Sequence, residues 1–159
     1  MNFDLDDDQA ALREFGLELA GRTEDAYWQE ADLEYRFPQE FWAELAETGM
    51  LGIALPEEFG GGGKGLLELA LAVEAIAEGG GGIEAGSLFL AGPVFGGCLL
   101  ERHGTQAQKE TYLPGLASGS MCAGAFTEPE SGSNITTIKT RAELRGDRYV
   151  INGQKVFIS

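Results

Sequence analysis

The sequence has few of the residues from which catalytic and metal sites are commonly built. Its 159 residues include one histidine, His103, and two cysteines, Cys98 and Cys122. The cysteines lie in apolar surroundings at a spacing that matches no metal or redox motif, so we interpret them as small core residues in a reducing compartment. The residues around His103 offer no Ser and Asp partners for a catalytic triad. We interpret His103 as a helix-end residue. We predict no metal site.

Basic residues are also scarce, with 11 Lys and Arg against 26 Asp and Glu and a formal net charge of -15. The charge is uneven, because residues 1–100 hold 20 acidic and 4 basic residues and residues 101–159 hold 6 and 7. An acidic surface repels polyphosphate backbones and anionic lipid, so we expect neither nucleic acid nor a membrane as a partner. An anionic ligand is expected near the neutral C-terminal third.

Long apolar runs are missing as well. No run reaches the ~20 apolar residues of a membrane span. The longest candidate, over 88–100, contains Gly92 and Pro93. The first residues are acidic, whereas a signal peptide begins with basic residues. We therefore expect a cytoplasmic protein.

Glycine is abundant, with 24 residues, while apolar residues make up 43% and charged residues 23% of the chain, a balance typical of a globular protein. The run GGGGKG over 60–65 contains G-x-G-x-x-G by composition alone. No strand leads into it, and Gly65 follows Lys64 where a phosphate-binding loop has Ser or Thr. We interpret this run, and the run over 79–82, as flexible turns.

Helical periodicity organises residues up to Ser118. Residues 51–63 are expected to be a connecting loop. The helix over 66–77 should bury one stripe, formed by Leu66, Leu69, Ala70, Val73 and Ile76. The expected helices are one capped by Asp6 and Gln9, one from Pro38 to Gly49, one over 66–77, one over 84–102 bent at Pro93, and one from Thr105 and Gln108 to Pro114 and Gly115.

Strand patterns follow, over 121–127, 135–144, 149–151 and 155–159, with turns at RGDR and at Asn152-Gly153. The fold class is therefore α+β, with an N-terminal all-α helical domain over 1–118 followed by an incomplete antiparallel β domain over 119–159. A sheet that ends in mid-pattern leaves an open edge and an uncovered face. We expect the chain to be a fragment or one piece of a larger assembly.

Between the first two strand patterns lies CAGAFTEPESGSN, residues 122–134, a dense group of hydrogen-bonding and turn-forming residues. Successive N–H groups in such a turn can cradle an anion, although local composition alone favours an ordinary polar turn. Glu128 and Glu130 resemble an acid and base pair, as in a glycosidase. Their spacing around Pro129 favours turn capping instead.

The order of these motifs carries a resemblance. AFTEPESGSN followed by TTIKTRAELRGDRYVINGQKVFIS closely resembles the central signature of the acyl-CoA dehydrogenase family. Upstream, GMLGIALPEEFGGGG and HGTQAQKETYLPGLASGSMCAGAF resemble the helical half of the same family. The resemblance covers essentially the whole chain and is specific for the superfamily, not for a substrate.

The resemblance implies three domains, a helical one, a β domain and a C-terminal four-helix domain that is absent here, with FAD between the last two. The Phe126 backbone and the Thr127 N–H and hydroxyl would meet the pyrimidine edge of the isoalloxazine. Gly132 and Ser133 would meet the cofactor phosphates, with Ser133 also near the acyl-CoA. Phe157 would pack on the flavin and Ser159 would bond near its N4 and N5 side.

The implied reaction removes the α-proton of an acyl-CoA thioester with a carboxylate and transfers the β-hydrogen as hydride to flavin N5. The family's general-base Glu belongs to the C-terminal domain, beyond Ser159, so no catalytic residue is assigned and the chain alone is expected to be inactive. The implied partners are the acyl-CoA substrate, an electron-transfer flavoprotein or similar acceptor, and a further copy or a heteromeric partner.

Three residues depart from the family pattern. Asn134 stands where Asp is usual, Gly124 stands where a bulky residue is common, and Phe157 often corresponds to Trp. The space at Gly124 suggests a bulkier acyl group. Two alternatives remain open: a related acyl-CoA oxidase, and a non-catalytic subunit or remnant that pairs with a complete partner through its unfinished sheet.

Overall fold

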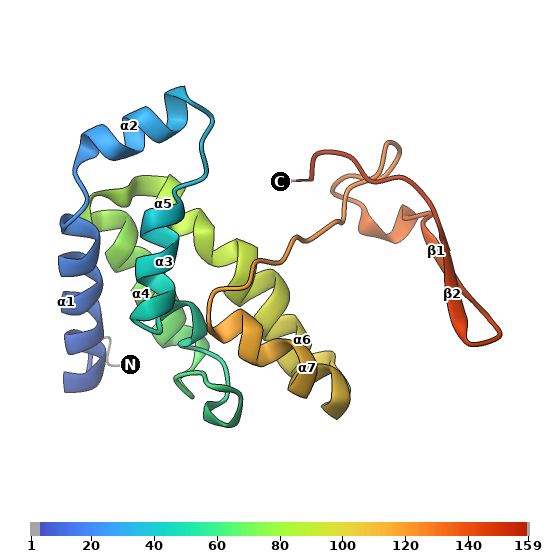
Figure 1. Ribbon diagram of the computed structural model, residues 1–159, viewed down its shortest axis with the longest axis horizontal. Coiled ribbons are helices and arrows are strands. Elements are labelled where there is room, and N and C mark those ends of the chain that lie inside the picture. The colour runs from blue at the N-terminus through green and yellow to red at the C-terminus, as the bar shows by residue number, and fades with distance from the viewer. Residues whose placement is uncertain (1–3, 159) are drawn as a thin grey trace. The chain divides into compact units, whose positions relative to one another are not determined.

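The computed structural model describes residues 4–158, and the chain divides into two compact units, Met1–Cys122 and Ala123–Ser159 (Figure 1). The first unit is helical and the second contains a two-stranded antiparallel sheet, as the α+β prediction requires. The helices are α1 (Asp7–Gly21), α2 (Asp25–Leu33), α3 (Gln39–Glu47), α4 (Leu66–Ile76), α5 (Gly82–Phe89), α6 (Leu99–His103) and α7 (Gln106–Ala117), and the strands are β1 (Arg141–Arg145) and β2 (Arg148–Asn152).

Reciprocal caps begin two of the helices, as predicted. At α1 the Gln9 N–H donates to the Asp6 carboxylate over 2.8 Å, and the Asp6 N–H donates to the Gln9 side chain over 3.2 Å. Thr105 and Gln108 form the same pair at α7. These contacts satisfy N–H groups that a helix start leaves without partners, so the local sequence is enough to set both starts.

The helix α2 was not predicted from the sequence. Its apolar pattern is sparse, since Trp28 and Ala31 are its buried residues. The Trp28 ring packs edge-on against Phe41 of α3, with ring centroids 5.0 Å apart. Because a nine-residue helix is marginal by itself, tertiary packing of this kind supplies most of its stability.

The expected connecting loop is a packed part of the core. It contains two 3₁₀ turns, Met50–Gly52 and Glu57–Phe59, and buries the side chains of Leu51 and Leu55. The glycine run is also ordered, because the N–H groups of residues 62, 63 and 64 donate to carbonyls of residues 52, 55 and 53. These donors are used inside the protein, so the run offers them to no phosphate.

The buried face of α4 differs from the predicted stripe. Leu69 and Ile76 are buried as expected, but Leu66 and Ala70 are exposed. Leu71, Ala72 and Ala75 are buried instead, because α4 packs against both α1 and α5. A helix with two packed neighbours buries a wider face than a single stripe indicates.

Residues 66–103 form a helical stretch that is long and apolar enough to cross a membrane by length and composition, a test that core helices also pass. No such run was expected from the sequence, where Gly92 and Pro93 interrupt the longest apolar candidate. The stretch is interrupted at Gly80, whose φ of 130° lies outside the helical range, so α4 and α5 are separate helices that pack on each other. The predicted bend at Pro93 lies in a π-helical segment, Leu90–Cys98, between α5 and α6.

The predicted end of the last helix at Pro114 and Gly115 is wrong, because α7 continues to Ala117. Proline is tolerated there because the last turn is held by packing. Leu113, Leu116 and Ala117 form a small core with Leu55 and Phe59. The larger core of this unit is built around aromatic and aliphatic side chains of α1 to α5.

In the second unit the hairpin at RGDR is confirmed, whereas the predicted hairpin turn at Asn152-Gly153 and the predicted strands over 121–127 and 155–159 are not. β1 and β2 pair from Arg141 with Asn152 to Arg145 with Arg148 around the RGDR turn. Residues 121–127 form no strand, residues 135–137 form a 3₁₀ turn, and residues 154–158 do not pair with β2. Gly153 instead packs against Thr140, where a Cβ would lie 2.1 Å from the Thr140 hydroxyl oxygen.

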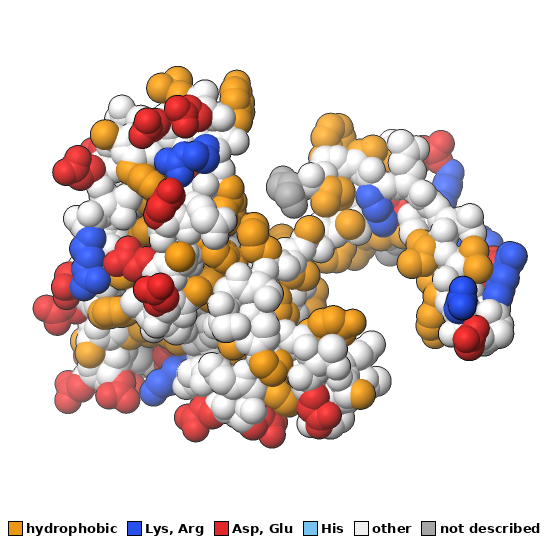
Figure 2. All heavy atoms as spheres, in the orientation of Figure 1, with side chains coloured by type: hydrophobic (Ala, Val, Ile, Leu, Met, Phe, Trp, Pro, Cys, Tyr) orange, Lys and Arg blue, Asp and Glu red, His pale blue; other side chains and the backbone are white. Residues whose placement is uncertain are grey.

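Both units follow the predicted charge asymmetry. Acidic side chains predominate on the face of the helical unit shown in Figure 2, whereas the second unit has 5 basic and 4 acidic residues. The two faces of the hairpin differ. The arginines of β1 and β2 lie on one face, and Leu144, Tyr149 and Ile151 are exposed on the other.

Candidate functional site

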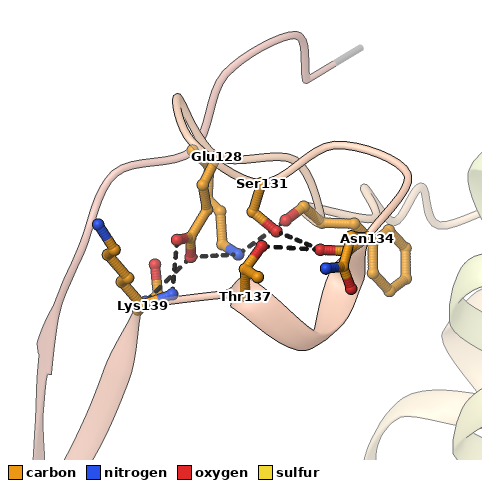
Figure 3. A network of polar contacts seen from close by, with 8 residues as sticks. Glu128, Ser131, Asn134, Thr137 and Lys139 are labelled. Atoms are coloured by element: carbon orange, nitrogen blue, oxygen red, sulfur yellow. Dashed lines mark hydrogen bonds and ion pairs between the residues drawn. The ribbon is translucent and has the colours of Figure 1, made fainter.

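The polar stretch after Thr127 folds into a turn that short-range hydrogen bonds hold together (Figure 3). Glu128 and Ser131 exchange two backbone hydrogen bonds of 2.9 and 3.1 Å. The buried Ser131 hydroxyl donates to the Asn134 carbonyl over 2.9 Å, and the Thr137 hydroxyl donates to the same carbonyl. The turn therefore has a defined shape set by short-range bonds.

Asn134, the residue that stands in place of Asp, retains a capping role. Its side-chain oxygen accepts from the Thr136 N–H over 3.3 Å and from the Thr136 hydroxyl over 2.6 Å. An amide oxygen can accept both bonds without a charge. The local bonding of the turn does not need a carboxylate at this position.

The Glu128 carboxylate accepts several hydrogen bonds within a polar network of the second unit (Figure 3). Glu128 is only 7% exposed. One carboxylate oxygen accepts from the Lys139 N–H over 2.7 Å, and the other accepts from the Thr140 N–H over 3.0 Å and from the Lys155 ammonium over 2.9 Å. A buried carboxylate is tolerated because these donors compensate its lost hydration.

These donors also set its protonation. The pKa of Glu128 is lowered to about 2 by the neighbouring Thr140 hydroxyl, the Lys139 N–H, the Lys155 ammonium and the Thr140 N–H, with burial opposing them. The Thr140 hydroxyl is buried and has no hydrogen bond of acceptable geometry within residues 4–158. We therefore attribute the lowered pKa of Glu128 mainly to the two N–H groups and to Lys155, whose contacts are well formed.

Lys155 joins two segments that the resemblance assigns to the flavin. Its ammonium donates to the Phe126 carbonyl over 2.9 Å as well as to Glu128. In the same place the Val156 N–H donates to the Thr127 carbonyl over 3.0 Å. Residues 126–128 and 155–157 therefore lie side by side.

The structure leaves the candidate ligand groups of the turn available. Thr127 is half-buried, and its N–H and hydroxyl have no hydrogen-bond partner within the described residues. Gly132 and Ser133 are exposed, and their N–H groups are likewise unpaired in that part of the chain. A Cβ at Gly132 would meet no atom within 4 Å, so internal packing does not require this glycine. The arrangement fits the close approach of an anionic ligand to the backbone.

The aromatic candidates are exposed. Phe126 is 46% exposed and Phe157 is 93% exposed. Phe157 has a φ of 56°, a left-handed conformation that is costly for a bulky residue and is found often at functional sites. Ser159 lies outside the described residues, so its predicted contact stays a prediction.

The acid and base interpretation of the two glutamates is not supported by this geometry. Glu130 is exposed and pairs with the Lys139 ammonium. Glu128 is tied to three donors and caps the backbone, as the turn-capping interpretation predicts. The contact between Glu128 and Lys155 was not predicted from the sequence, because the two residues are 27 positions apart and no motif links them.

His103, Cys98 and the acidic residues form no second candidate site among residues 4–158. His103 is the last residue of α6, as expected, and borders an apolar cavity of about 630 Å³ in the helical unit. Burial raises the pKa of the Cys98 thiol, which disfavours a reactive thiolate. Among residues 4–158 no group of three or more His, Cys, Asp or Glu residues is placed to hold a metal ion.

The chain is similar to proteins of one family. Residues 6–120 match the family model described as acyl-CoA dehydrogenase, N-terminal domain. Acyl-CoA dehydrogenase FadE12 of Mycobacterium tuberculosis is 38% identical over 154 residues, which are 96% of this chain and 39% of that protein. The chain therefore spans about two fifths of the length of this relative.

Solved structures agree with the sequence match. The FAD complex of PigA has a TM-score of 0.88 at 30% identity and covers 99% of this chain, which corresponds to 42% of the PigA chain. A glutaryl-coenzyme A dehydrogenase in complex with glutaryl-CoA has a TM-score of 0.90 at 27% identity, with 99% of this chain and 40% of that chain covered. The similarity extends through both the helical unit and the hairpin unit.

Proposed function

Because the chain belongs to the acyl-CoA dehydrogenase family, we propose that it is the N-terminal part of an FAD-dependent enzyme that introduces an α,β double bond into an acyl-CoA thioester. One observation carries the proposal. Hydrogen bonds of Glu128, Ser131 and Asn134 hold the turn at 127–134 together, and among residues 4–158 the predicted ligand groups of Thr127, Gly132 and Ser133 have no hydrogen-bond partner. These donors are accessible to a ligand, and successive N–H groups of a turn can bind an anion.

The residues present fit FAD. The Phe126 backbone and the Thr127 N–H and hydroxyl would hold the pyrimidine edge of the isoalloxazine, and Phe157 would pack on the ring. Gly132 and Ser133 would hold the phosphates, with Ser133 also reaching the acyl-CoA. When bound, the flavin supplies the hydride acceptor for the substrate's β-hydrogen, while the protein supplies binding and orientation.

Charge supports the placement of an anionic cofactor on this unit. The helical unit is strongly acidic, whereas residues 123–159 are nearly neutral. Backbone N–H groups in a turn can hold a phosphate without a dense cluster of cations. The diphosphate would therefore meet its donors where repulsion between like charges is smallest.

The role of this chain is to position the cofactor, not to remove the α-proton. A general base works best when its pKa lies near the operating pH. Glu128 fails this condition because its pKa is about 2 and its oxygens are occupied by three donors. We assign the proton abstraction to a carboxylate of the family's C-terminal domain.

An absorption spectrum tests the proposal most directly. The protein expressed from its whole open reading frame should carry a yellow flavin that bleaches anaerobically when an acyl-CoA is added. An electron-transfer flavoprotein should then reoxidise it, whereas rapid reoxidation by oxygen would favour the oxidase variant of the proposal. Colourless protein that takes up no added FAD would contradict it.

The exposed apolar face of the hairpin favours a second candidate, a non-catalytic subunit that pairs with a complete partner. Leu144, Tyr149 and Ile151 are each more than 60% exposed on one side of a two-stranded sheet. Such a face is normally covered. A stable, colourless heteromer formed with a full-length homologue would support this candidate, and so would its loss in the Leu144→Thr, Ile151→Thr variant.

A further inference from the structure

We infer that Glu128 and Lys155 form a clamp that positions residues 126–128 and 155–157 for flavin binding. The inference rests on the proposed function and deepens it, because neither side chain belongs to the set of expected flavin contacts. The clamp is the group of hydrogen bonds that the Glu128 carboxylate and the Lys155 ammonium make with each other and with the backbone of both segments.

The geometry shows how one ion pair controls several backbone groups. The Lys155 ammonium donates to the Phe126 carbonyl and to Glu128, each over 2.9 Å. Next to it the Val156 N–H donates to the Thr127 carbonyl over 3.0 Å. The carbonyls of both expected pyrimidine-edge residues therefore accept hydrogen bonds from the protein, while the Thr127 N–H and hydroxyl have no partner in the part of the chain that the structure describes.

Glu128 connects this arrangement to the start of the hairpin. Its carboxylate accepts the N–H groups of Lys139 and Thr140, which lead directly into β1. The side chains of Glu128 and Lys155 are 6% and 23% exposed, so water competes little for the pair. Buried charge-assisted hydrogen bonds of this kind hold geometry well and are costly to break from one side.

The chemistry of the carboxylate explains why glutamine cannot replace it. Glu128 presents two acceptor oxygens to three donors. A glutamine presents one oxygen and one NH₂ group, which is itself a donor. Glu128→Gln therefore places a donor against a donor on one side of the clamp, with little change of volume.

The same unit offers a matched control. Glu130 and Lys139 also form a carboxylate–ammonium pair, but their side chains are 70% and 71% exposed, and Glu130 accepts no backbone N–H in the part of the chain that the structure describes. Glu130→Gln makes the same chemical change at a solvent-exposed pair. Exposed pairs contribute little because water and salt screen them.

The experiment measures the clamp and the flavin separately in the protein from the whole open reading frame. Amide hydrogen exchange of Val156 and Thr140 in the apoprotein reports the clamp without any cofactor. FAD affinity and the visible spectrum of the bound flavin report positioning. Circular dichroism of each variant verifies that the helical unit remains folded.

In Glu128→Gln and Lys155→Met we expect exchange of the Val156 amide and the FAD dissociation constant each to rise by at least about tenfold, the effect of losing roughly one charge-assisted hydrogen bond. The visible band of the bound flavin should also shift. Lys155→Arg, which keeps a cationic donor, should lose less affinity than Lys155→Met. Glu130→Gln should behave as wild type.

The outcomes separate the two hypotheses. Unchanged Val156 exchange in Glu128→Gln would overturn the clamp, whether or not FAD binds. Faster exchange with unchanged FAD affinity and spectrum would overturn its positioning role. A wild-type protein that binds no FAD would overturn the proposed function and the positioning role with it, while the exchange data would still show whether the two segments are clamped.

Discussion

The indole N–H of Trp42 donates to the carbonyl of Gly119 over 2.8 Å, across 77 positions of the sequence. The contact ties α3 to the chain just after α7. Gly119 suits this place in two ways: its φ is +99°, and a Cβ there would lie 2.8 Å from the Ala46 Cβ. A hydrogen bond between an almost fully buried tryptophan and a backbone position that requires glycine therefore links two distant parts of the helical unit.

Trp42→Phe should destabilise the helical unit, because it removes this donor and part of a buried ring. The fair comparison is Trp28→Phe, since the Trp28 indole N–H is buried without a partner among residues 4–158. We expect Trp42→Phe to cost about 1 kcal/mol more than Trp28→Phe in urea unfolding, the net worth of one hydrogen bond. Equal costs for the two substitutions would show that the contact adds no stability.

Gly16→Ala should weaken the packing of α1 on α4. A Cβ at Gly16 would lie 2.8 Å from the Ala75 Cβ, closer than two carbon atoms can pack. Overpacking of this kind costs about 1–3 kcal/mol. Gly86→Ala is the control, because its nearest neighbours are 3.6 Å away and alanine favours a helix by up to about 1 kcal/mol. In thermal unfolding, Tm should be lower than that of wild type for Gly16→Ala but not for Gly86→Ala. Adding Ala75→Gly to the Gly16→Ala variant should restore Tm.

The pH dependence of the second unit should follow Glu128. Its pKa in the folded protein, about 2, is lowered from 4.5, so its contribution to stability is fully present above the unfolded-state pKa and is lost as pH falls from about 4.5 through about 2. The groups that face or neighbour it are Lys139, Lys155 and Glu130. Amide exchange of Thr140, corrected for intrinsic rates, should accelerate over this range in wild type. In Glu128→Gln it should be fast throughout, and an unchanged pH profile in that variant would assign the transition to another group.

Substitution of Gly132 should separate folding from ligand binding. A Cβ there would meet no atom within 4 Å among the described residues, so Gly132→Ala and Gly132→Val should leave Tm of the apoprotein unchanged. Both should weaken FAD binding, Val more than Ala, because each blocks the approach of a phosphate to the backbone. A graded loss in a flavin fluorescence titration supports this, whereas loss of Tm without loss of affinity contradicts it.

Sequence reasoning succeeded where the signal is local. The caps at Asp6 and Thr105 and the RGDR hairpin depend on hydrogen bonds between residues a few positions apart. Predictions were wrong where contacts between residues distant in the sequence determine the local structure. The helix over Asp25–Leu33 depends on the contact of Trp28 with Phe41, and the helix end at Ala117 depends on a small core shared with Leu55.

The candidate site shows the same division. The resemblance singled out Thr127, Gly132 and Ser133, and their backbone N–H groups have no hydrogen-bond partner within residues 4–158. Nothing in the sequence marked Glu128 and Lys155 as partners, because their contact joins segments that are distant along the chain. The flavin contacts themselves, including those of Phe157 and Ser159, remain predictions.

By itself the sequence determined the α+β order, the charge asymmetry, the helix caps and the family, because each is written in residue types and short spacings. Only the tertiary structure decided which face of α4 is buried, which predicted strands fail to pair, and that a buried carboxylate holds residues 126–128 beside residues 155–157. The reason is physical: burial and ion pairing depend on which distant groups meet after the chain has folded, and no local pattern contains that information.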